Sequence, residues 1–228
     1  MPNTISHLLN EPNNEVGFDY IQDPVAIEQK SFQLIRELTD LSAFDATEQQ
    51  VVMRIVHSLG LVHLAPQVRF SAKACVAGMA ALASNNAILC DVEMVKQGIT
   101  KRMISEPPLC FLNHPEVAEL AKLRGETRTM AALELWRPHL TGSVVVIGNA
   151  PTALFRLLEM LQQGAPKPAL IIGMPVGFVG AAESKQALWH LHQDLGIECI
   201  TLLGREGGSA VSSASCNALL RCNHGERY

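Results

Sequence analysis

The chain has 228 residues, of which 48% are hydrophobic and 18% charged, and its formal net charge at neutral pH is −4. This charge is not the excess of basic residues that is typical of a nucleic-acid-binding protein. No uninterrupted apolar run reaches the roughly 18 residues that a membrane-spanning helix needs. The polar segment 1–18 lacks the basic start and apolar stretch of a secretory signal. We therefore expect a cytoplasmic protein of one domain over residues 1–228, flexible at 1–18 and 221–228.

The cysteines and histidines form no pattern that is typical of a metal site. The six cysteines are scattered without a CxxC pair, and the one close histidine pair, His190 and His192, is two residues apart. Two helical residues at that spacing do not share a face. These spacings argue against a zinc site and against a disulfide framework.

The predicted elements begin with two helices and continue as alternating strands and helices. Asp23-Pro24 starts a helix that runs to about Thr39, and Asp45 starts another that ends near Gly60. From about residue 62 onward, short apolar runs alternate with helical patterns, which predicts a parallel sheet between two layers of helices. The expected strands lie near Val68 and at residues 87–90, 143–147, 169–172 and 199–203.

Three polar residues stand out on the predicted helices. His57 projects away from the apolar stripe of its helix, so it is not a core histidine, and periodicity leaves open whether it is solvated or functional. Ser31 lies on the apolar face of the first helix, where its hydroxyl either bonds back to the carbonyl of Ile27 or approaches a ligand. Arg128 shares a face with apolar residues, so it either pairs with a glutamate or awaits a carboxylate ligand.

Three glycine-rich turns follow three of the predicted strands. They are GNAPTALF at 148–155, GMPVGFVGAAESK at 173–185 and GREGGS at 204–209. Glycine alone explains only tight turns, but three such turns at adjacent carboxyl ends of parallel strands favour a rim that binds carboxylates. Asp91, at the end of another predicted strand, cannot attract acidic groups, and we expect it to cap the following helix or to orient a basic residue.

These three motifs, in this order, resemble the precorrin-8X methylmutase family of cobalamin biosynthesis. Three upstream segments are similar to the same family: RIVHSLG at 54–60, ILCDVEMV at 88–95 and TRTMAAL at 127–133. The resemblance extends from about residue 20 to about residue 219. It implies a flavodoxin-like three-layer α/β/α fold with a central parallel sheet, a helical N-terminal segment and a homodimer.

The resemblance also implies a reaction and its residues. The family isomerises precorrin-8X to hydrogenobyrinate by moving a methyl group from C-11 to C-12 of the corrin ring, which requires no redox cofactor, metal or ATP. The histidine of the family's RxxHxxG pattern is proposed to protonate the tetrapyrrole, so His57 is the predicted catalytic residue. The predicted substrate contacts are Ser31, Arg128, Asn149, Thr152, Gly177, Ser184, Lys185, Arg205 and Ser209.

Other functions are weighed against this one. The sequences of segments 88–95 and 173–185 resemble the branch of the family that acts on the cobalt-free substrate. The alternative substrate is cobalt-precorrin-8, which would give cobyrinate. A non-catalytic flavodoxin-like module that binds a tetrapyrrole or a nucleotide is a further alternative, although GxGxxG after the first strand and GxxxxGK[ST] are both missing. A corrin-pathway methyltransferase would need a glycine-rich S-adenosylmethionine pattern, and the sequence has none. We expect a small-molecule substrate and neither a nucleic-acid nor a membrane partner.

Overall fold

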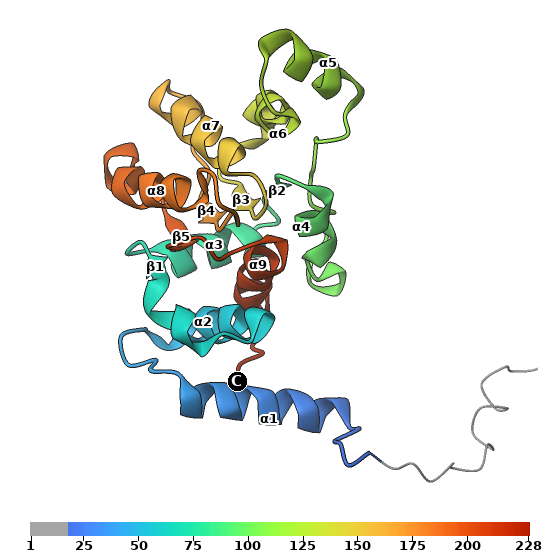
Figure 1. The fold of residues 1–228 in the computed structure, drawn as a ribbon, viewed down its shortest axis with the longest axis vertical. Helices are drawn as coiled ribbons and strands as arrows, with labels where there is room; N and C mark the ends of the chain where they lie inside the picture. The colour runs from blue at the N-terminus through green and yellow to red at the C-terminus, as the bar shows by residue number, and fades with distance from the viewer. Residues whose placement is uncertain (1–17) are drawn as a thin grey trace, which may run out of the picture.

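The protein is described by a computed structural model that covers residues 18–228, so the flexibility expected for residues 1–17 lies outside the described residues. A five-stranded sheet lies between two layers of helices (Figure 1). The three-layer α/β/α arrangement with a helical N-terminal segment is confirmed. No helix in the described part of the chain is both long and apolar enough to cross a membrane.

The sheet has the strand order β1-β5-β4-β3-β2. Strands β2 to β5 are parallel, whereas β1 runs antiparallel to β5, with Val68 opposite Leu202. The edge strand β1 therefore differs from the predicted parallel sheet. After β1, α3 carries the chain past β3 and β4 to the opposite edge, where β2 begins. The order also differs from the 2-1-3-4-5 order of flavodoxin itself. The strands are β1 (Val68–Phe70), β2 (Ile88–Cys90), β3 (Val144–Ile147), β4 (Leu170–Gly173) and β5 (Cys199–Leu202).

The central strands are buried on both faces, as a parallel sheet covered by helices requires. Successive residues of β3 enter two different cores. Val144 and Val146 belong to the core that includes α9, and Val145 and Ile147 belong to the core that includes α7 and α8. Each apolar run thus joins both layers of helices.

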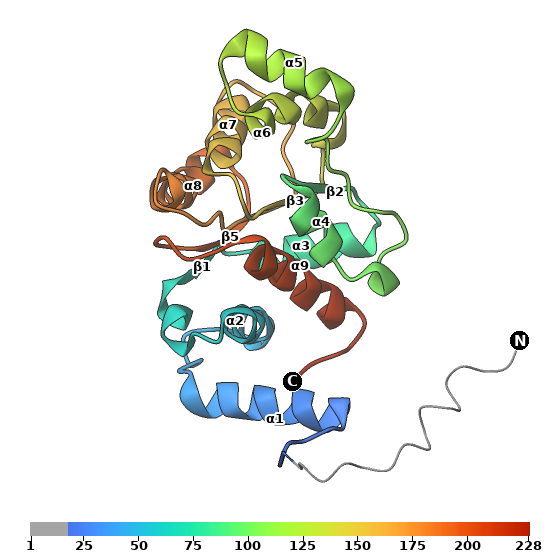
Figure 2. The same cartoon turned by 45° about the vertical axis from the view of Figure 1, so that its right-hand side comes forward.

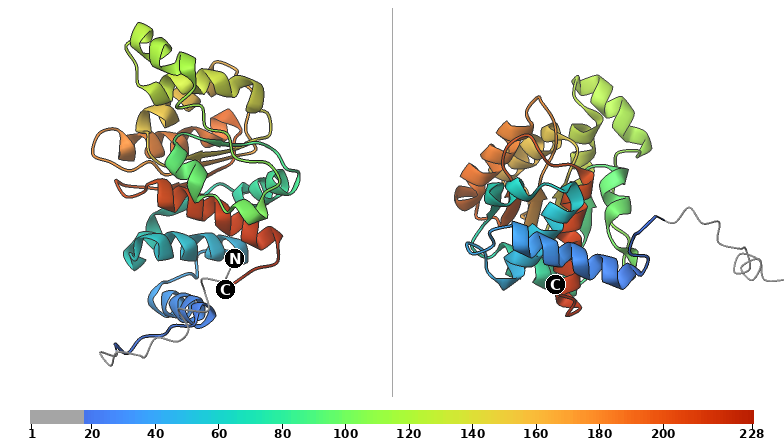
Figure 3. Two further views of the ribbon diagram at one scale, coloured as in Figure 1. Left: turned by 90° about the vertical axis from the view of Figure 1, so that its right-hand side faces the viewer. Right: turned by 60° about the horizontal axis from the view of Figure 1, so that its bottom comes forward.

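Helices α7 and α8 cover one face of the sheet, and α3, α4 and α9 cover the other (Figures 1 and 3). Short helices complete the connections: η2 (Val62–Gln67) leads into β1, and η3 (Lys101–Met103) follows α4. The helices on the two faces are α3 (Ala74–Ala83), α4 (Glu93–Gly98), α7 (Pro151–Gln162), α8 (Ala181–Leu195) and α9 (Ser209–Asn223).

Two further helices, α1 (Pro24–Leu38) and α2 (Ala46–Leu59), lie outside α9, with α1 farthest from the sheet (Figure 2). Both begin as predicted: Asp23 accepts a hydrogen bond from the N–H of Ala26 (2.7 Å), and Asp45 forms a capping box with Glu48. Helix α2 ends at Gly60, whose φ of 69° is left-handed.

The connection from β2 to β3 contains α5 (Pro115–Arg124), α6 (Arg128–Ala132) and η4 (Leu133–His139). Helix α6 packs against both α5 and α7, so this insertion lies beside the N-terminal end of α7. Figure 2 shows α5 at the outer end of the molecule, opposite α1.

The C-terminal segment 221–228, for which the sequence predicted flexibility, forms contacts with the rest of the chain. Arg221 belongs to the last turn of α9, and Tyr228 packs against the core next to α1 and α2. These contacts could not be predicted from the polar composition of the segment, because they depend on one aromatic residue, Tyr228.

Candidate active site

One edge of the sheet carries the three glycine-rich turns. The carboxyl ends of β3, β4 and β5 are adjacent because these strands pair in parallel. We call the turns at 148–152, 174–180 and 203–209 the rim. The N–H of Gly208 donates to the carbonyl of Met174 (2.8 Å), and the N–H of Gly177 donates to the carbonyl of Arg205 (3.2 Å). A Cβ at Gly207 would collide with the Met174 carbonyl, so the second and third turns can join only because this residue is glycine.

Asp91, directly after β2, holds the first turn of the rim. Its buried carboxylate accepts hydrogen bonds from the N–H groups of Gly148, Asn149 and Ala150 at 3.1, 2.9 and 2.9 Å. Burial raises the pKa of Asp91, and the three N–H bonds act in the opposite direction. These donors belong to the turn that leads into α7, so the carboxylate holds this turn. The prediction that Asp91 caps the helix that follows it in sequence is wrong, because no side chain among the described residues caps α4. The N–H groups of this turn are already occupied and cannot bind a substrate carboxylate.

The second and third turns lead into helices whose N-termini are open. The N-cap residues of α8 and α9 are Gly180 and Gly208, and in the described chain no side chain caps either helix. A helix N-terminus carries partial positive charge and unpaired N–H groups. These two turns therefore keep the anion-binding capacity that the first turn has lost. Ser209, the first residue of α9, is buried, and its Cα would lie 2.8 Å from a Cβ at Gly148, so the first and third turns are also in contact.

Two predicted substrate contacts, Ser184 and Lys185, lie beneath the rim and are fully buried. The hydroxyl of Ser184 donates to the carbonyl of Ala181 (3.1 Å), and Nζ of Lys185 donates to the carbonyl of Glu206 (2.5 Å). Burial lowers the pKa of Lys185 to about 8. These side chains therefore tie α8 to the third turn and do not face the solvent.

Apolar side chains stand out from the second turn, and the sequence analysis did not identify them. Phe178 and Val179 are 88% and 89% exposed, and Val176 is exposed beside them. The guanidinium of Arg205 lies 5.8 Å from the centre of the Phe178 ring. Exposed apolar surface next to a cation suits a flat apolar ligand that carries carboxylates. Their exposure could have been predicted from the sequence, because they stand between glycines, where neither a strand nor a helix would bury them.

Arg128 and Thr152 lie together beside the first turn. Arg128 is the first residue of α6, and the hydroxyl oxygens of its neighbours Thr127 and Thr129 are 3.0 and 3.4 Å from Oγ1 of Thr152. Asn149 is exposed in the same turn. Arg128, Asn149, Thr152, Gly177, Arg205 and Ser209 therefore lie along one continuous edge.

Arg128 is exposed and has no ion-pair partner in the described part of the chain. The glutamates closest to it in sequence pair with other arginines, Glu126 with Arg156 and Glu134 with Arg124. Internal pairing, one of the two alternatives for Arg128, is thus not observed. Its guanidinium is open to a carboxylate from outside the chain.

His57 and Ser31 lie on a different part of the molecule. The exposed His57 ring stacks on Phe32 of α1, with the ring centres 5.1 Å apart and the planes at 11°. Burial, and after it the charge of Arg54, lower the pKa of His57, whereas Glu28 acts to raise it. Ser31 is half-buried, and the described residues offer its hydroxyl no hydrogen bond, the one to Ile27 included. Among the described residues, no hydrogen bond or ring contact joins His57 or Ser31 to the rim.

The surroundings of His57 differ from the predicted polar face. Gln50 and Met53 are buried, at 5% and 0% exposure, because the C-terminal tail covers this side of α2. Helix α2 is consequently buried over most of its circumference, and His57 is one of its few exposed residues.

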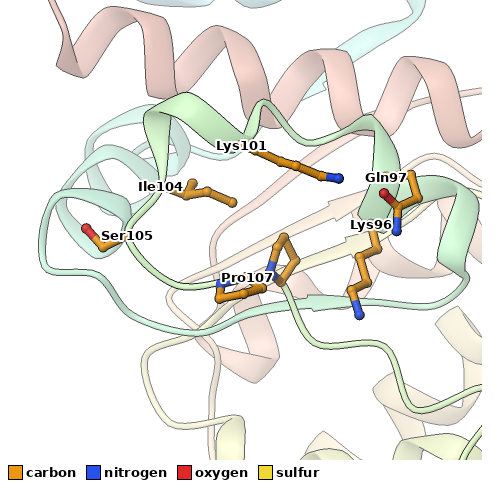
Figure 4. A pocket seen from close by; sticks show the side chains of 7 residues that line it. Lys96, Gln97, Lys101, Ile104, Ser105 and Pro107 are labelled. Carbon is orange, nitrogen blue, oxygen red and sulfur yellow. The ribbon is translucent and has the colours of Figure 1, made fainter. Parts of the chain in front are cut away.

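A cavity of about 370 Å³ lies between α4 and residues 104–108 (Figure 4). The side chains of Lys96, Gln97 and Lys101 line it opposite Pro107. None of the predicted site residues contributes to this cavity, so it is separate from the rim.

The six cysteines are free thiols, and five of them are buried. Residues 18–228 contain no group of three or more His, Cys, Asp or Glu side chains that could hold a metal ion.

Comparisons with known proteins cover nearly the whole described chain. A family model described as precorrin-8X methylmutase matches residues 26–222. A precorrin-8X methylmutase of Pseudomonas aeruginosa is 50% identical over 203 residues, which cover 88% of this chain and 97% of that protein. A cobalt-precorrin-8 methylmutase of Methanothermobacter thermautotrophicus is 39% identical over 196 residues, covering 85% and 91%. The crystal structure of the precorrin-8X methylmutase from Thermus thermophilus is 34% identical, with a TM-score of 0.79 and coverage of 89% of this chain and 98% of that chain.

Proposed function

This chain belongs to the precorrin-8X methylmutase family, isomerases of cobalamin biosynthesis, and we propose that it converts precorrin-8X to hydrogenobyrinate by moving a methyl group from C-11 to C-12 of the corrin ring. The observation that carries the proposal is the family match over residues 26–222. Because identity is 50% to a relative named for precorrin-8X and 39% to one named for the cobalt compound, we take the cobalt-free form as the substrate. The cobalt form, which would give cobyrinate, is the second candidate.

In the proposed reaction His57 is the proton donor. Its imidazole is a general acid when it is protonated, which its lowered pKa favours on the acidic side of neutral pH, and the ring is exposed, so it can reach a bound macrocycle. A proton or hydrogen bond given to a ring nitrogen next to the migrating centre makes the ring more electron-poor, which favours the migration. The bond from the methyl carbon to C-11 breaks and the bond to C-12 forms within one molecule, so nothing else is consumed.

The rim holds the acetate and propionate arms of the substrate. Arg128 and Arg205 are exposed cations that can each bind a carboxylate, and Phe178 offers apolar surface to the macrocycle beside Arg205. The open N-termini of α8 and α9 add N–H donors. Fixing the arms orients the ring before the methyl group moves.

The proposed enzyme is a homodimer that completes its active site at the interface. On α1, Ile27, Ser31, Leu34 and Leu38 are spaced by four, three and four residues and form one stripe along the helix. The three apolar members are 44%, 41% and 66% exposed. A second copy packed on this stripe would cover Ser31 and could bring its rim to His57 of the first copy. We propose a cytoplasmic enzyme with a small-molecule substrate and without a nucleic-acid or membrane partner.

The test is the visible absorption of purified protein mixed with metal-free precorrin-8X, with the cobalt form in a parallel cuvette. We expect the hydrogenobyrinate spectrum in the metal-free cuvette. Turnover of the cobalt form alone would support the proposed methyl shift and show that the substrate contains cobalt. No change in either cuvette, with the protein folded, would refute the proposed activity.

A further inference from the structure

The last described residue joins α1 to α2. The N–H of Tyr228 donates to Oε1 of Gln50 (2.8 Å) on α2, and Nε2 of Gln50 donates back to the carbonyl of Tyr228 (3.3 Å). Arg36, on α1, also donates to this carbonyl. The hydroxyl of Tyr228 donates to Oε1 of Glu28 (2.8 Å), again on α1. Tyr228 therefore binds residues of both α1 and α2, the two helices that pack on each other.

The Tyr228 side chain continues a stack of rings that ends at His57. The centres of the Tyr228 and Phe32 rings are 3.6 Å apart with the planes at 9°, and the centres of the Phe32 and His57 rings are 5.1 Å apart with the planes at 11°. Phe32 is 2% exposed and stacks with both the tyrosine and the histidine. A buried ring in two such pairs has little freedom to tilt, and aromatic pairs of this kind contribute beyond their buried area.

Charged side chains also contact the stacked rings of Tyr228 and Phe32. The guanidinium of Arg54 lies 4.6 Å from the centre of the Tyr228 ring and 4.7 Å from that of Phe32, and it pairs with Glu28 at 2.9 Å. Arg221 of α9 lies 5.5 Å from the Tyr228 ring and pairs with Glu226 of the tail at 2.8 Å. Glu28 and Glu226 thus pair with Arg54 and Arg221 around the rings, and Glu226 also pairs with Arg102 at 3.3 Å.

We propose that Tyr228 is a positioning residue for His57, and that it acts through Phe32 to hold α1 against α2 and to fix the plane of the imidazole. The functional part of this inference rests on the proposed role of His57 as proton donor. Tyr228 lies outside the residues 26–222 that the family model matches. Besides stacking on Phe32, Tyr228 contacts Arg54 with its ring and binds Glu28 with its hydroxyl.

The experiment compares wild-type protein with Tyr228→Leu, Tyr228→Phe and, as a matched control, Tyr20→Leu. Tyr20 is the other tyrosine of the chain and is 64% exposed. The first readout is the NMR resonance of the His57 imidazole in the free protein, assigned by its loss in His57→Asn. It reports ring geometry and needs no substrate. The second readout is kcat and KM for metal-free precorrin-8X, with thermal unfolding measured alongside.

We expect Tyr228→Leu to shift the His57 resonance and to lower kcat about tenfold with KM changed less than twofold, because a small misplacement of a reacting group costs rate more than binding. Tyr228→Phe keeps the ring stack and should restore both readouts to near the wild-type values. If Tyr228→Leu proves unstable, Gln50→Met releases the tail from α2 and should reproduce the same shift.

The proposal is overturned if Tyr228→Leu leaves the His57 resonance and kcat as Tyr20→Leu does, or if Tyr228→Phe is as impaired as Tyr228→Leu. A wild-type protein that does not convert precorrin-8X would instead refute the proposed function. In that case the resonance alone still decides whether Tyr228 positions His57.

Discussion

Replacing Asp91 by asparagine tests whether an internal carboxylate builds the first turn of the rim. One carboxylate oxygen accepts the N–H of Gly148, and the other accepts those of Asn149 and Ala150. Asparagine has nearly the same shape but only one acceptor oxygen, so its NH₂ group must face at least one of these N–H donors. The variant also removes the negative charge from the N-terminus of α7.

The expected loss follows from these contacts. A hydrogen bond to a charged group contributes about 1.5–3 kcal/mol, and a buried donor left without an acceptor costs about 1–3 kcal/mol. The neutral amide avoids the burial of a charge, which offsets part of this loss. We expect the free energy of unfolding to fall by about 2–4 kcal/mol. For a domain of this size the melting temperature should fall by about 5–12 °C.

The assay is urea and thermal unfolding of Asp91→Asn beside Asp45→Asn. Asp45 also accepts backbone N–H groups, from Thr47 and Glu48 at 2.8 Å each, but it is an exposed N-cap, where asparagine serves as well as aspartate. The control should therefore change the free energy of unfolding by less than about 0.5 kcal/mol. If Asp91→Asn loses no more than the control does, the buried carboxylate is not what holds the turn.

Three further substitutions test the site. His57→Asn should lower kcat by about 10²–10⁴-fold while substrate binding persists. Since burial and Arg54 lower the pKa of His57 and the donor is the protonated ring, wild-type kcat/KM should fall as the pH rises through a value below 6.5, and His57→Asn should lack this limb. The pKa of Lys185 is lowered to about 8, so as the pH rises the folded protein releases this proton before the unfolded chain does. The free energy of unfolding of the wild type should therefore rise relative to that of Lys185→Met between about pH 8 and pH 10.5. A difference between the two proteins that stays constant with pH in urea titrations would contradict this. Leu34→Glu should convert the dimer to monomers in sedimentation experiments, whereas Leu123→Glu, at an 84% exposed leucine of α5, should not; equal behaviour of the two variants would exclude α1 from the interface.

The framework could be predicted from the sequence because its signals are local. Asp23-Pro24 and the Asp45–Glu48 box mark the helix starts that the structure shows. The buried runs at 144–147, 170–173 and 199–202 fall where apolar residues without helical periodicity predicted strands. The direction of β1 could not be predicted in this way, because three residues carry no signal that separates antiparallel from parallel pairing.

The interior of the candidate site could not be predicted, because its partners are far apart in the chain. Asp91 binds N–H groups that are 57 to 59 residues away, and Tyr228 binds Glu28 across 200 residues. The sequence indicates that a buried carboxylate needs hydrogen-bond donors, but it does not indicate which residues supply them. The resemblance to a family named candidate residues, and only the fold could separate the buried Lys185 from the exposed Arg128.

Charges along the rim divide into those used inside the protein and those left for a ligand. Asp91 and Lys185 are buried, and each takes backbone groups as partners: the carboxylate takes N–H donors and the ammonium group takes a carbonyl. Arg128 and Arg205 are exposed and have no ion-pair partner in the described chain. Because the inner pair holds the turns, substitutions there should reduce stability first and substrate affinity second. Because neither outer side chain forms a hydrogen bond or an ion pair in the described chain, substitutions at Arg128 or Arg205 should reverse that order, raising KM with little change in the free energy of unfolding.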